Sequence, residues 1–360
     1  MSHRRITSRR GRPPQGLNPR AGRVLGGVVR GYLRSGEPVG SSDAVRFGRL
    51  RISPATVRVV MAELTAGGLL TQPHTSAGRI PTQAGFRVYV DHLMRARRPS
   101  EEARDALEAR LEVDAHSPRR LIQAASRHLA VTCAQTAFGR RPRLEHAPIR
   151  RLELLPLTGG RCVAILVLGN GVVIDRVLEV DPALGEVDFV RAANLFNERW
   201  VGSPLNDARR RLRSEIETAE TGDPALALLQ VAETALKGPD VPEDAVVVEG
   251  RTHLLVSDDV GGDMAPIVSA LEDKRLLLEL LEGIDCDPGQ GPRVLFGEET
   301  QNNALRQCTV VAASYGFAEN RMGTVAIIGP VRMDYARIVP WVGCTADAIS
   351  GILVKRHVAA

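Results

Sequence analysis

The chain has 360 residues, of which 44% are hydrophobic and 25% charged, so it is long enough to bury the cores of two or three domains. Its apolar runs are shorter than the roughly 18 residues that cross a bilayer, and no apolar segment follows the basic N-terminus, so we expect a cytoplasmic protein with neither a membrane span nor a secretory signal. Residues 1 to 100 hold 18 Arg and 4 acidic residues, a net charge of +14 in a chain whose total is +5, which leaves −9 for the remainder and predicts a polyanion-binding N-terminal module.

The N-terminal segment, residues 1 to 20, is rich in Arg, Pro and Gly and has no apolar period, which predicts a disordered basic tail. From residue 21, apolar residues recur every three or four positions, which predicts a helix that ends near "SGEPVGS". Ser41 or Ser42 is expected to cap a short second helix that ends near Gly48, because a serine hydroxyl can accept from the first free amide groups.

A third helix is expected to begin with Ser53 as its N-cap and Pro54 at its first position. Its inward face shares one helical stripe, formed by Val57, Val60, Met61 and Leu64. The same spacing turns Thr56, Arg58 and Val59 outward near the N-terminal end. Two glycines, 67 and 68, should end this helix.

A short hairpin is expected next, with strands at 69 to 71 and 79 to 80 around the loop "QPHTSAG". Three helices followed by a basic hairpin are typical of a winged helix-turn-helix domain, here residues 21 to 98. Such a domain places one helix in the DNA major groove while a loop reaches the backbone or minor groove beside it.

The remainder of the chain alternates helices and strands, which predicts an α+β domain that holds an insertion. The expected helices cover 101 to 113, 117 to 131, 264 to 282 and 334 to 353, and residues 184 to 237 are mostly helical. The expected strands cover 149 to 157, 161 to 168, 172 to 180, 245 to 256, 293 to 297, 307 to 313 and 323 to 329.

Four stretches resemble the HrcA family, the bacterial heat-shock repressors. They are "YLRSGEPVGS" at 32 to 41, "SPATVRVVMAELTAGGLLTQPHTSAGRIPTQAGFRVYVDHL" at 53 to 93, "LFGEE" at 295 to 299 and "GTVAIIGPVRMDYARIVPWV" at 323 to 342. Val59 departs from the family, which usually has a polar residue there, and the Arg-rich tail is longer than is usual.

The resemblance implies an α+β multidomain protein with an N-terminal winged helix, a GAF-like domain at residues 99 to 190 and 257 to 360, and an inserted, mostly helical dimerisation domain at residues 191 to 256. It also implies a homodimer that represses chaperone operons from an inverted-repeat operator in double-stranded DNA, and a GroE-type chaperonin that maintains its activity. Such a repressor would be cytoplasmic and associated with the nucleoid.

The candidate DNA-binding residues lie on the second and third helices and on the hairpin. Arg58 can bond a guanine edge or a phosphate, and Val59 can contact a thymine methyl group. Thr56 and Ser53 can reach phosphates, although capping alone also accounts for Ser53. The remaining candidates are Ser41, Ser42, His74, Thr75, Ser76 and Arg79. The last four form the tip and second strand of the hairpin, for which structural packing is the alternative interpretation.

The candidate dimer contacts lie in the inserted block, because one winged helix reads only a few base pairs and two half-sites need two chains. They are Leu195, Phe196, Trp200 and Leu205, although Trp200 is equally compatible with a place in the core of the insertion.

Enzymatic function has no support in the sequence, which lacks GxGxxG after a strand, GxxxxGK[ST], HExxH and GxSxG in a credible context. Its five cysteines have no metal-ligand spacing, so we expect no metal or other cofactor and mostly buried thiols. In "GPVRMDYARI", Asp334 is expected to cap the last helix, and a small-ligand pocket is the alternative. A nonspecific nucleic-acid-binding protein or a ligand-responsive regulator of other genes remains the competing function.

Overall fold

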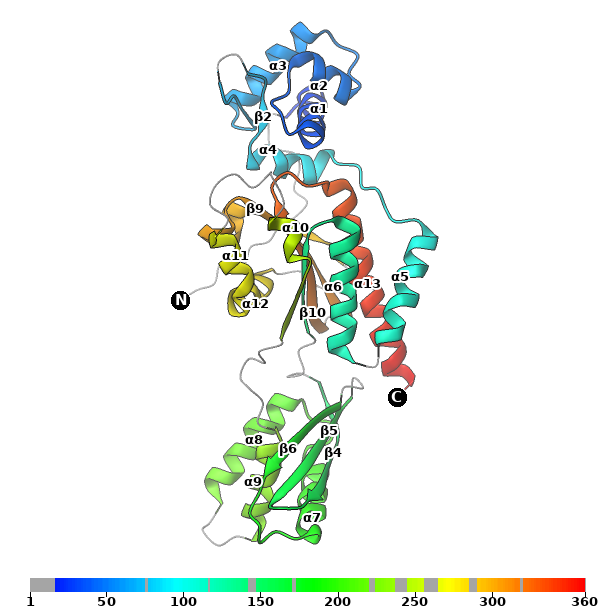
Figure 1. Cartoon of the computed structure of the whole chain (residues 1–360), viewed down its shortest axis with the longest axis vertical. Coiled ribbons are helices and arrows are strands. Elements are labelled where there is room, and N and C mark those ends of the chain that lie inside the picture. The colour runs from blue at the N-terminus through cyan, green and yellow to red at the C-terminus, as the bar shows by residue number, and fades with distance from the viewer. Residues whose placement is uncertain are drawn as a thin grey trace.

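A computed structural model describes residues 17–74, 77–115, 117–141, 147–169, 173–219, 224–236, 245–255, 265–284, 290–317 and 320–359 of the chain. Three parts follow one another along the long axis of the molecule (Figure 1). An N-terminal helical module lies at one end, a five-stranded sheet with helices on both faces lies in the middle, and a three-stranded sheet with its own helices lies at the other end. The chain is thus a mixed helix and sheet protein.

The N-terminal module has the predicted order of three helices and a hairpin. Its elements are α1 (Pro19–Ser35), α2 (Ser41–Gly48), α3 (Pro54–Ala66), β1 (Leu70–Thr71) and β2 (Ile80–Pro81). Helix α1 begins two residues earlier than expected, because the Asn18 side chain accepts a hydrogen bond from the Ala21 amide at 2.7 Å. The expected basic tail falls mostly on residues outside the described ranges.

The predicted N-cap of α2 is wrong. Gly40 occupies that position without a side-chain cap, and Ser41 and Ser42 are the first two helical residues. The Ala44 amide already donates to the Gly40 carbonyl at 2.9 Å, so the helix begins one residue before the serines can cap it.

The module is held together by the apolar faces of α1 and α3. The predicted inward residues of α3 are confirmed as buried, as are four of the six on α1, whereas Tyr32 and Leu33 near the end of α1 are partly buried. The buried set comprises Val24, Leu25, Val28, Val29, Val57, Val60, Met61 and Leu64. Gly27 allows α1 and α2 to cross closely, because a Cβ atom there would lie 2.6 Å from the Ala44 carbonyl oxygen.

A helical joint, α4 (Gln83–Val88) followed by a π-helix (Tyr89–Leu93), connects this module to the middle of the molecule. The chain then runs through an extended segment, residues 94 to 100, to α5 (Glu101–Asp114) and α6 (Pro118–Cys133).

The central sheet has the strand order β7-β3-β10-β9-β8, and every neighbouring pair is antiparallel. The strands are β3 (Thr136–Arg140), β7 (Val246–Glu249), β8 (Arg293–Phe296), β9 (Cys308–Phe317) and β10 (Asn320–Pro330). Two short 3₁₀ helices (Gly297–Thr300 and Asn303–Leu305) follow β8. Strand β3 was not expected from the sequence.

Both faces of the central sheet are covered, which explains the continuous apolar sequence of its inner strands. Val311 and Val325 pack toward α5, α6 and α13 (Tyr335–Ala359), whereas Val310 and Ala326 pack toward α10 (Arg251–Leu255), α11 (Ala265–Glu272) and α12 (Lys274–Gly283).

Helix α13 contains a stretch, Tyr335–Lys355, that is long and apolar enough by length and composition to cross a membrane, although no such span is expected from the sequence. It packs against β9, β10, α5 and α6 in the central unit, as the core helix of a soluble protein would.

The third part is larger than the predicted insertion. The strands β4 (Ile149–Leu157), β5 (Arg161–Leu168) and β6 (Val173–Glu179) were assigned to the interrupted domain, but they pair only with one another. They share a core with α7 (Glu186–Trp200), α8 (Leu205–Thr218) and α9 (Pro224–Leu236). The chain leaves the central sheet after β3 and returns at β7, and these two strands pair directly with each other. The insertion therefore lies between β3 and β7 and is a mixed sheet and helix unit.

Two expected elements are divided in the structure. The strand expected over 245 to 256 ends at Glu249, because Gly250 has a φ of 71° and turns the chain into α10. The helix expected over 264 to 282 is interrupted at Asp273, whose carboxylate accepts from the amides of Arg275 and Leu276 at 2.9 and 3.1 Å and starts α12.

Candidate nucleic-acid interface

The outward face of α3 carries the strongest candidates for DNA contact. The Ser53 hydroxyl accepts from the Thr56 amide at 3.1 Å and lies 2.9 Å from the Thr56 hydroxyl, so the predicted capping role is confirmed. Arg58 is exposed and, among the described residues, no carboxylate pairs with it. Val59 is 61% exposed, which is unusual for a valine in a helix with a well-packed opposite face. The first two turns of α3 thus present a charged and an apolar side chain to the outside.

The hairpin is fastened to the rest of the module through Arg79. Its main chain exchanges two hydrogen bonds of 2.9 Å with Val39, and its Nε donates to the Thr65 hydroxyl at 3.1 Å near the end of α3. Gly78 permits this approach, because a Cβ atom there would lie 2.5 Å from the Val39 carbonyl. The side chain expected to reach DNA is therefore also part of the hairpin packing that was the alternative interpretation.

The loop of the hairpin holds the remaining predicted contacts. His74 is exposed, and its carbonyl accepts from the Ala77 amide at 2.9 Å. Thr75 and Ser76 lie outside the described residues. At the start of α2, Ser41 is half-buried and Ser42 is exposed.

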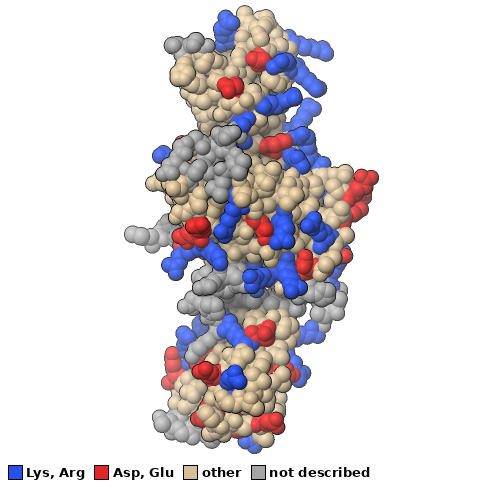
Figure 2. All heavy atoms as spheres, viewed as in Figure 1, with Lys and Arg blue, Asp and Glu red and all other residues tan. Residues whose placement is uncertain are grey.

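A groove rich in arginine lies between the N-terminal module and the central unit and was not expected from the sequence. It has a volume of about 1840 Å³ and is lined by eight arginines, one histidine and one acidic residue. Arg23, Arg30 and Arg34 line it from α1, at positions i, i+7 and i+11 of one helical face. That spacing could have revealed the arginine row of α1, although not the wall that faces it. Figure 2 shows the corresponding concentration of basic side chains along one flank of the N-terminal module.

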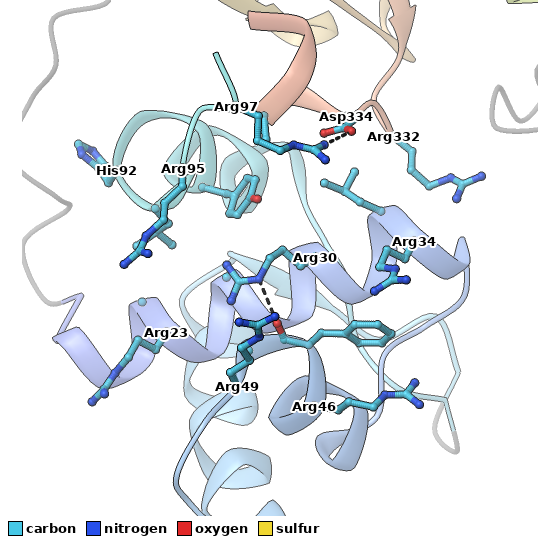
Figure 3. Close-up of a pocket in the computed structure, with 18 of the residues that line it drawn as sticks. Arg23, Arg30, Arg34, Arg46, Arg49, His92, Arg95, Arg97, Arg332 and Asp334 are labelled. Atoms are coloured by element: carbon cyan, nitrogen blue, oxygen red, sulfur yellow. Dashed lines mark hydrogen bonds and ion pairs between the residues drawn. The ribbon is translucent and has the colours of Figure 1, made fainter. Parts of the chain in front are cut away.

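The acidic residue in the groove is Asp334, which precedes α13. Its carboxylate pairs with Arg97 of the extended segment, while its carbonyl accepts from the amide of Ile338 at 2.9 Å. The expected side-chain cap is thus replaced by a long-range ion pair, which closes one side of the groove (Figure 3).

The joint helix α4 is fixed to the central unit by an aromatic cluster and by Arg87. The Phe86 ring lies 6.3 Å from that of Phe296 and 6.0 Å from that of Tyr335. Arg87 pairs with Glu299, donates to the Val294 carbonyl at 2.7 Å and lies 4.7 Å over the Phe296 ring. The "LFGEE" and "GPVRMDY" stretches therefore contact the N-terminal module.

The residues expected at a dimer contact are mostly buried in the insertion itself. Phe196, Trp200 and Leu205 are each 2% exposed or less, and Leu195 is half-buried against the same core. The burial of Trp200 agrees with the alternative interpretation given for it, a place in the core of the insertion, and Phe196 and Leu205 lie in the same core. Side chains buried to this extent have little surface left for a contact with a second chain.

The outer face of β4, β5 and β6 lies away from that core and carries a group of apolar side chains beside the charged Arg151, Glu153 and Asp175. Val163 of β5 lies between Leu155 and Val177 in the strand register, and Ile165 and Val167 follow on the same face. Val177 is 62% exposed and Leu155 is 49% exposed. Along β5, Val163, Ile165 and Val167 alternate with the buried Cys162, Ala164 and Leu166, and this alternation in the sequence could have identified the outer face.

In the described ranges, no group of three His, Cys, Asp or Glu residues is arranged to hold a metal ion.

Comparison with known proteins supplies the family context. The model of the HrcA protein C-terminal domain matches residues 119–339. A heat-inducible transcription repressor HrcA from Geobacter sulfurreducens is 32% identical over 334 residues, which cover 92% of this chain and 96% of that protein. The protein of the same name from Laribacter hongkongensis is 35% identical over 340 residues, 94% of this chain and 96% of its own. A crystal structure described as that of a hypothetical protein has the same fold over 94% of this chain and 99% of its own, with a TM-score of 0.59 and 20% identity.

Proposed function

The chain belongs to the HrcA family of heat-inducible transcription repressors, and from that premise we propose that it represses chaperone operons by binding an inverted-repeat operator as a homodimer. Its class, a transcriptional repressor of heat-shock genes, follows from the family. The operator, the dimer and the means of control are proposals about this chain.

DNA binding is assigned to the N-terminal module as a winged helix, with α3 in the major groove and the hairpin beside it. The observation that carries this assignment is the exposed pair Arg58 and Val59 on a helix whose opposite face is buried. Arg58 would bond a base edge or a phosphate, and Val59 would contact a thymine methyl group. Asp43 and Glu63 are the acidic residues of α2 and α3, so the module repels phosphates little.

Dimerisation is assigned to the outer face of the three-stranded sheet. Several large apolar side chains exposed on one face mark an interaction surface, and a second copy of the chain offers the matching apolar face. In the register, Glu153 and Asp175 flank Ile165 and would lie at the polar rim. Two joined chains can then present two winged helices to the two halves of an inverted repeat.

The central unit is proposed to be the GAF-like domain, and a GroE-type chaperonin is proposed to keep the repressor competent for binding. If only a fraction f of the chains is competent, the apparent dissociation constant rises by 1/f. A fall of f from near one to ~0.01 would weaken operator binding about a hundredfold, or ~2.7 kcal/mol. Unfolded proteins that occupy the chaperonin would produce this fall during heat shock. We place the repressor in the cytoplasm, on the nucleoid.

An electrophoretic titration with an inverted-repeat operator and a scrambled duplex of equal length tests the repressor assignment. A repressor should prefer the operator by about 10³-fold or more at physiological salt, whereas a nonspecific nucleic-acid-binding protein should bind both duplexes alike with the same salt dependence.

Adding chaperonin with ATP, and then an unfolded competitor protein, tests the proposed control. Operator binding should rise with the chaperonin and fall with the competitor. Binding that is maximal without chaperonin and insensitive to both additions would redirect attention to a ligand of the central unit.

A further inference from the structure

The arginine groove has two walls that belong to different parts of the molecule. Arg23, Arg30 and Arg34 extend from α1, whereas Arg95 lies on the segment that leaves the π-helix (Figure 3). Arg332 comes from the turn before α13. From Arg23 to Arg34, α1 rises roughly 16 Å at about 1.5 Å per residue, so the guanidinium groups form an extended row.

The positive charge of this groove is balanced only in part by protein carboxylates, since Arg46 pairs with Asp43 at 2.9 Å and Arg97 pairs with Asp334. Asp334 is the acidic residue of its lining, and its carboxylate is engaged by Arg97. Within the described ranges, no carboxylate pairs with Arg23, Arg34 or Arg95, and all three side chains are exposed. Like charges on facing walls repel each other, so an anion that enters between them gains attraction from both sides.

The lining distinguishes among anions. A site for single-stranded nucleic acid combines basic groups with aromatic faces on which bases stack. Here the Phe47 ring has the guanidinium of Arg46 at 4.7 Å and that of Arg34 at 5.7 Å, and Tyr89 is buried with 4% exposure. The groove therefore recognises phosphate charge but has little surface on which to stack bases.

Duplex DNA also fits this shape poorly. A duplex is read when a protruding helix or strand enters its grooves, as proposed for α3. The arginine groove is concave and carries cations on both walls. Arginine forks suit the oxygens of successive phosphates that lie between such walls.

We propose that this groove binds a linear oligophosphate, a chain of linked phosphates recognised through its charge and not through bases. The site is separate from the outward face of α3, so the inference does not depend on operator recognition. The bound oligophosphate would connect α1 to Arg95 and Arg332 and would hold the N-terminal module against the central unit.

Isothermal titration of the full chain with inorganic polyphosphate of medium length, tripolyphosphate and pyrophosphate tests the proposal. Affinity should increase with chain length, because a longer chain reaches more of the arginine row. The triple variant Arg23→Gln, Arg34→Gln, Arg95→Gln should bind medium-length polyphosphate at least tenfold more weakly. Its salt slope should be smaller by about two, taking ~0.7 for each lost phosphate contact as in flexible single strands.

The matched control is Arg150→Gln, Arg191→Gln, Arg211→Gln, which removes the same charge from exposed positions of the insertion. It should keep the affinity within about twofold, as should Arg58→Ala on α3. Equal losses in the two triple variants, or no binding by the unmodified protein, would overturn the proposal. A random single-stranded oligonucleotide is the competing ligand. If the unmodified protein binds it more tightly than polyphosphate, and the groove triple variant but not the control variant loses this binding, the groove is a site for a nucleic-acid strand.

Discussion

At the scale of single residues, Arg58 and Val59 are exposed on a helix whose opposite face is buried, and we propose that both contact DNA. Their neighbours Val57 and Val60 are buried, whereas Val59 is 61% exposed and lacks such packing. The pair is therefore better explained by a partner outside the chain.

Arg58→Ala should reduce discrimination between operator and scrambled duplex by ~1–3 kcal/mol if the guanidinium reads a base. Competition titrations with the two duplexes measure this difference. The control is Arg98→Ala, which removes an exposed arginine from the connecting segment. If Arg58→Ala weakens both duplexes equally and lowers the salt slope by about one, the side chain contacts a phosphate.

The buried cysteines lead to a second prediction. Burial raises the pKa of the Cys133 thiol and of the Cys308 thiol to about 12. Because the thiolate is the reactive form, both residues should resist a maleimide at pH 8 while the protein is folded and react after unfolding in guanidinium. Residue-resolved mass spectrometry measures this, with half-buried Cys344 as the internal comparison. Labelling of Cys308 as fast as that of Cys344 in the native protein would contradict the packing described for β9.

At the scale of elements, the joint helix α4 connects the central unit to the N-terminal module through a buried aromatic cluster. Phe86 is 1% exposed and contacts aromatic rings from β8, α13 and α1. Arg87 adds an ion pair and a cation–π contact at the same place.

Phe86→Ala should cost ~3–5 kcal/mol of packing at this joint. Its local effect should be faster tryptic cleavage after the exposed Arg95 and Arg97, because the segment is no longer held by a fixed joint. Limited proteolysis at several times, with fragments identified by mass, gives the rates.

Phe189→Ala is the matched control, since Phe189 is also a buried phenylalanine but lies in the core of the insertion. It should leave cleavage in the connecting segment unchanged. Equal acceleration by the two variants would mean that the joint has no separate role.

At the scale of the whole molecule, the proposed dimer depends on the outer face of β4 to β6. Ile165 occupies the middle of the central strand of that face, opposite Glu153 and Asp175. Ile165→Asp would bury a carboxylate among apolar side chains of a second copy and next to two like charges, which strongly opposes association.

The expected result is a monomer in sedimentation velocity with weaker binding to the full operator, whereas circular dichroism of the folded chain should change little. Val131→Asp is the control, because Val131 is 72% exposed on α6, which belongs to the central unit and not to this sheet (Figure 1). A variant Ile165→Asp that sediments as the unmodified protein does would place the dimer contact elsewhere.

The sequence by itself determined the local elements and the charge asymmetry. Ser53 and Pro54 started α3 where expected, and the inward stripe from Val57 to Leu64 was recognisable, because capping and helical periodicity depend on neighbours within one or two turns. The resemblance in "QPHTSAGRIPT" and "IGPVRMDYARI" was enough to identify the family, as the comparisons confirm.

Tertiary structure alone decided which strands share a sheet and which side chains meet. Strands β4 to β6 were expected in the interrupted domain, because an alternation of apolar residues predicts a strand but not the strand with which it pairs. For the same reason, Phe196 and Trp200 were expected at a dimer contact, although they lie in the core of the insertion. The arginine groove likewise could not be predicted without knowing which distant segments meet. Its walls are brought together by the pair of Arg97 with Asp334, 237 positions apart, and by the packing of Phe86, and long-range contacts of this kind leave no periodic signal in the chain.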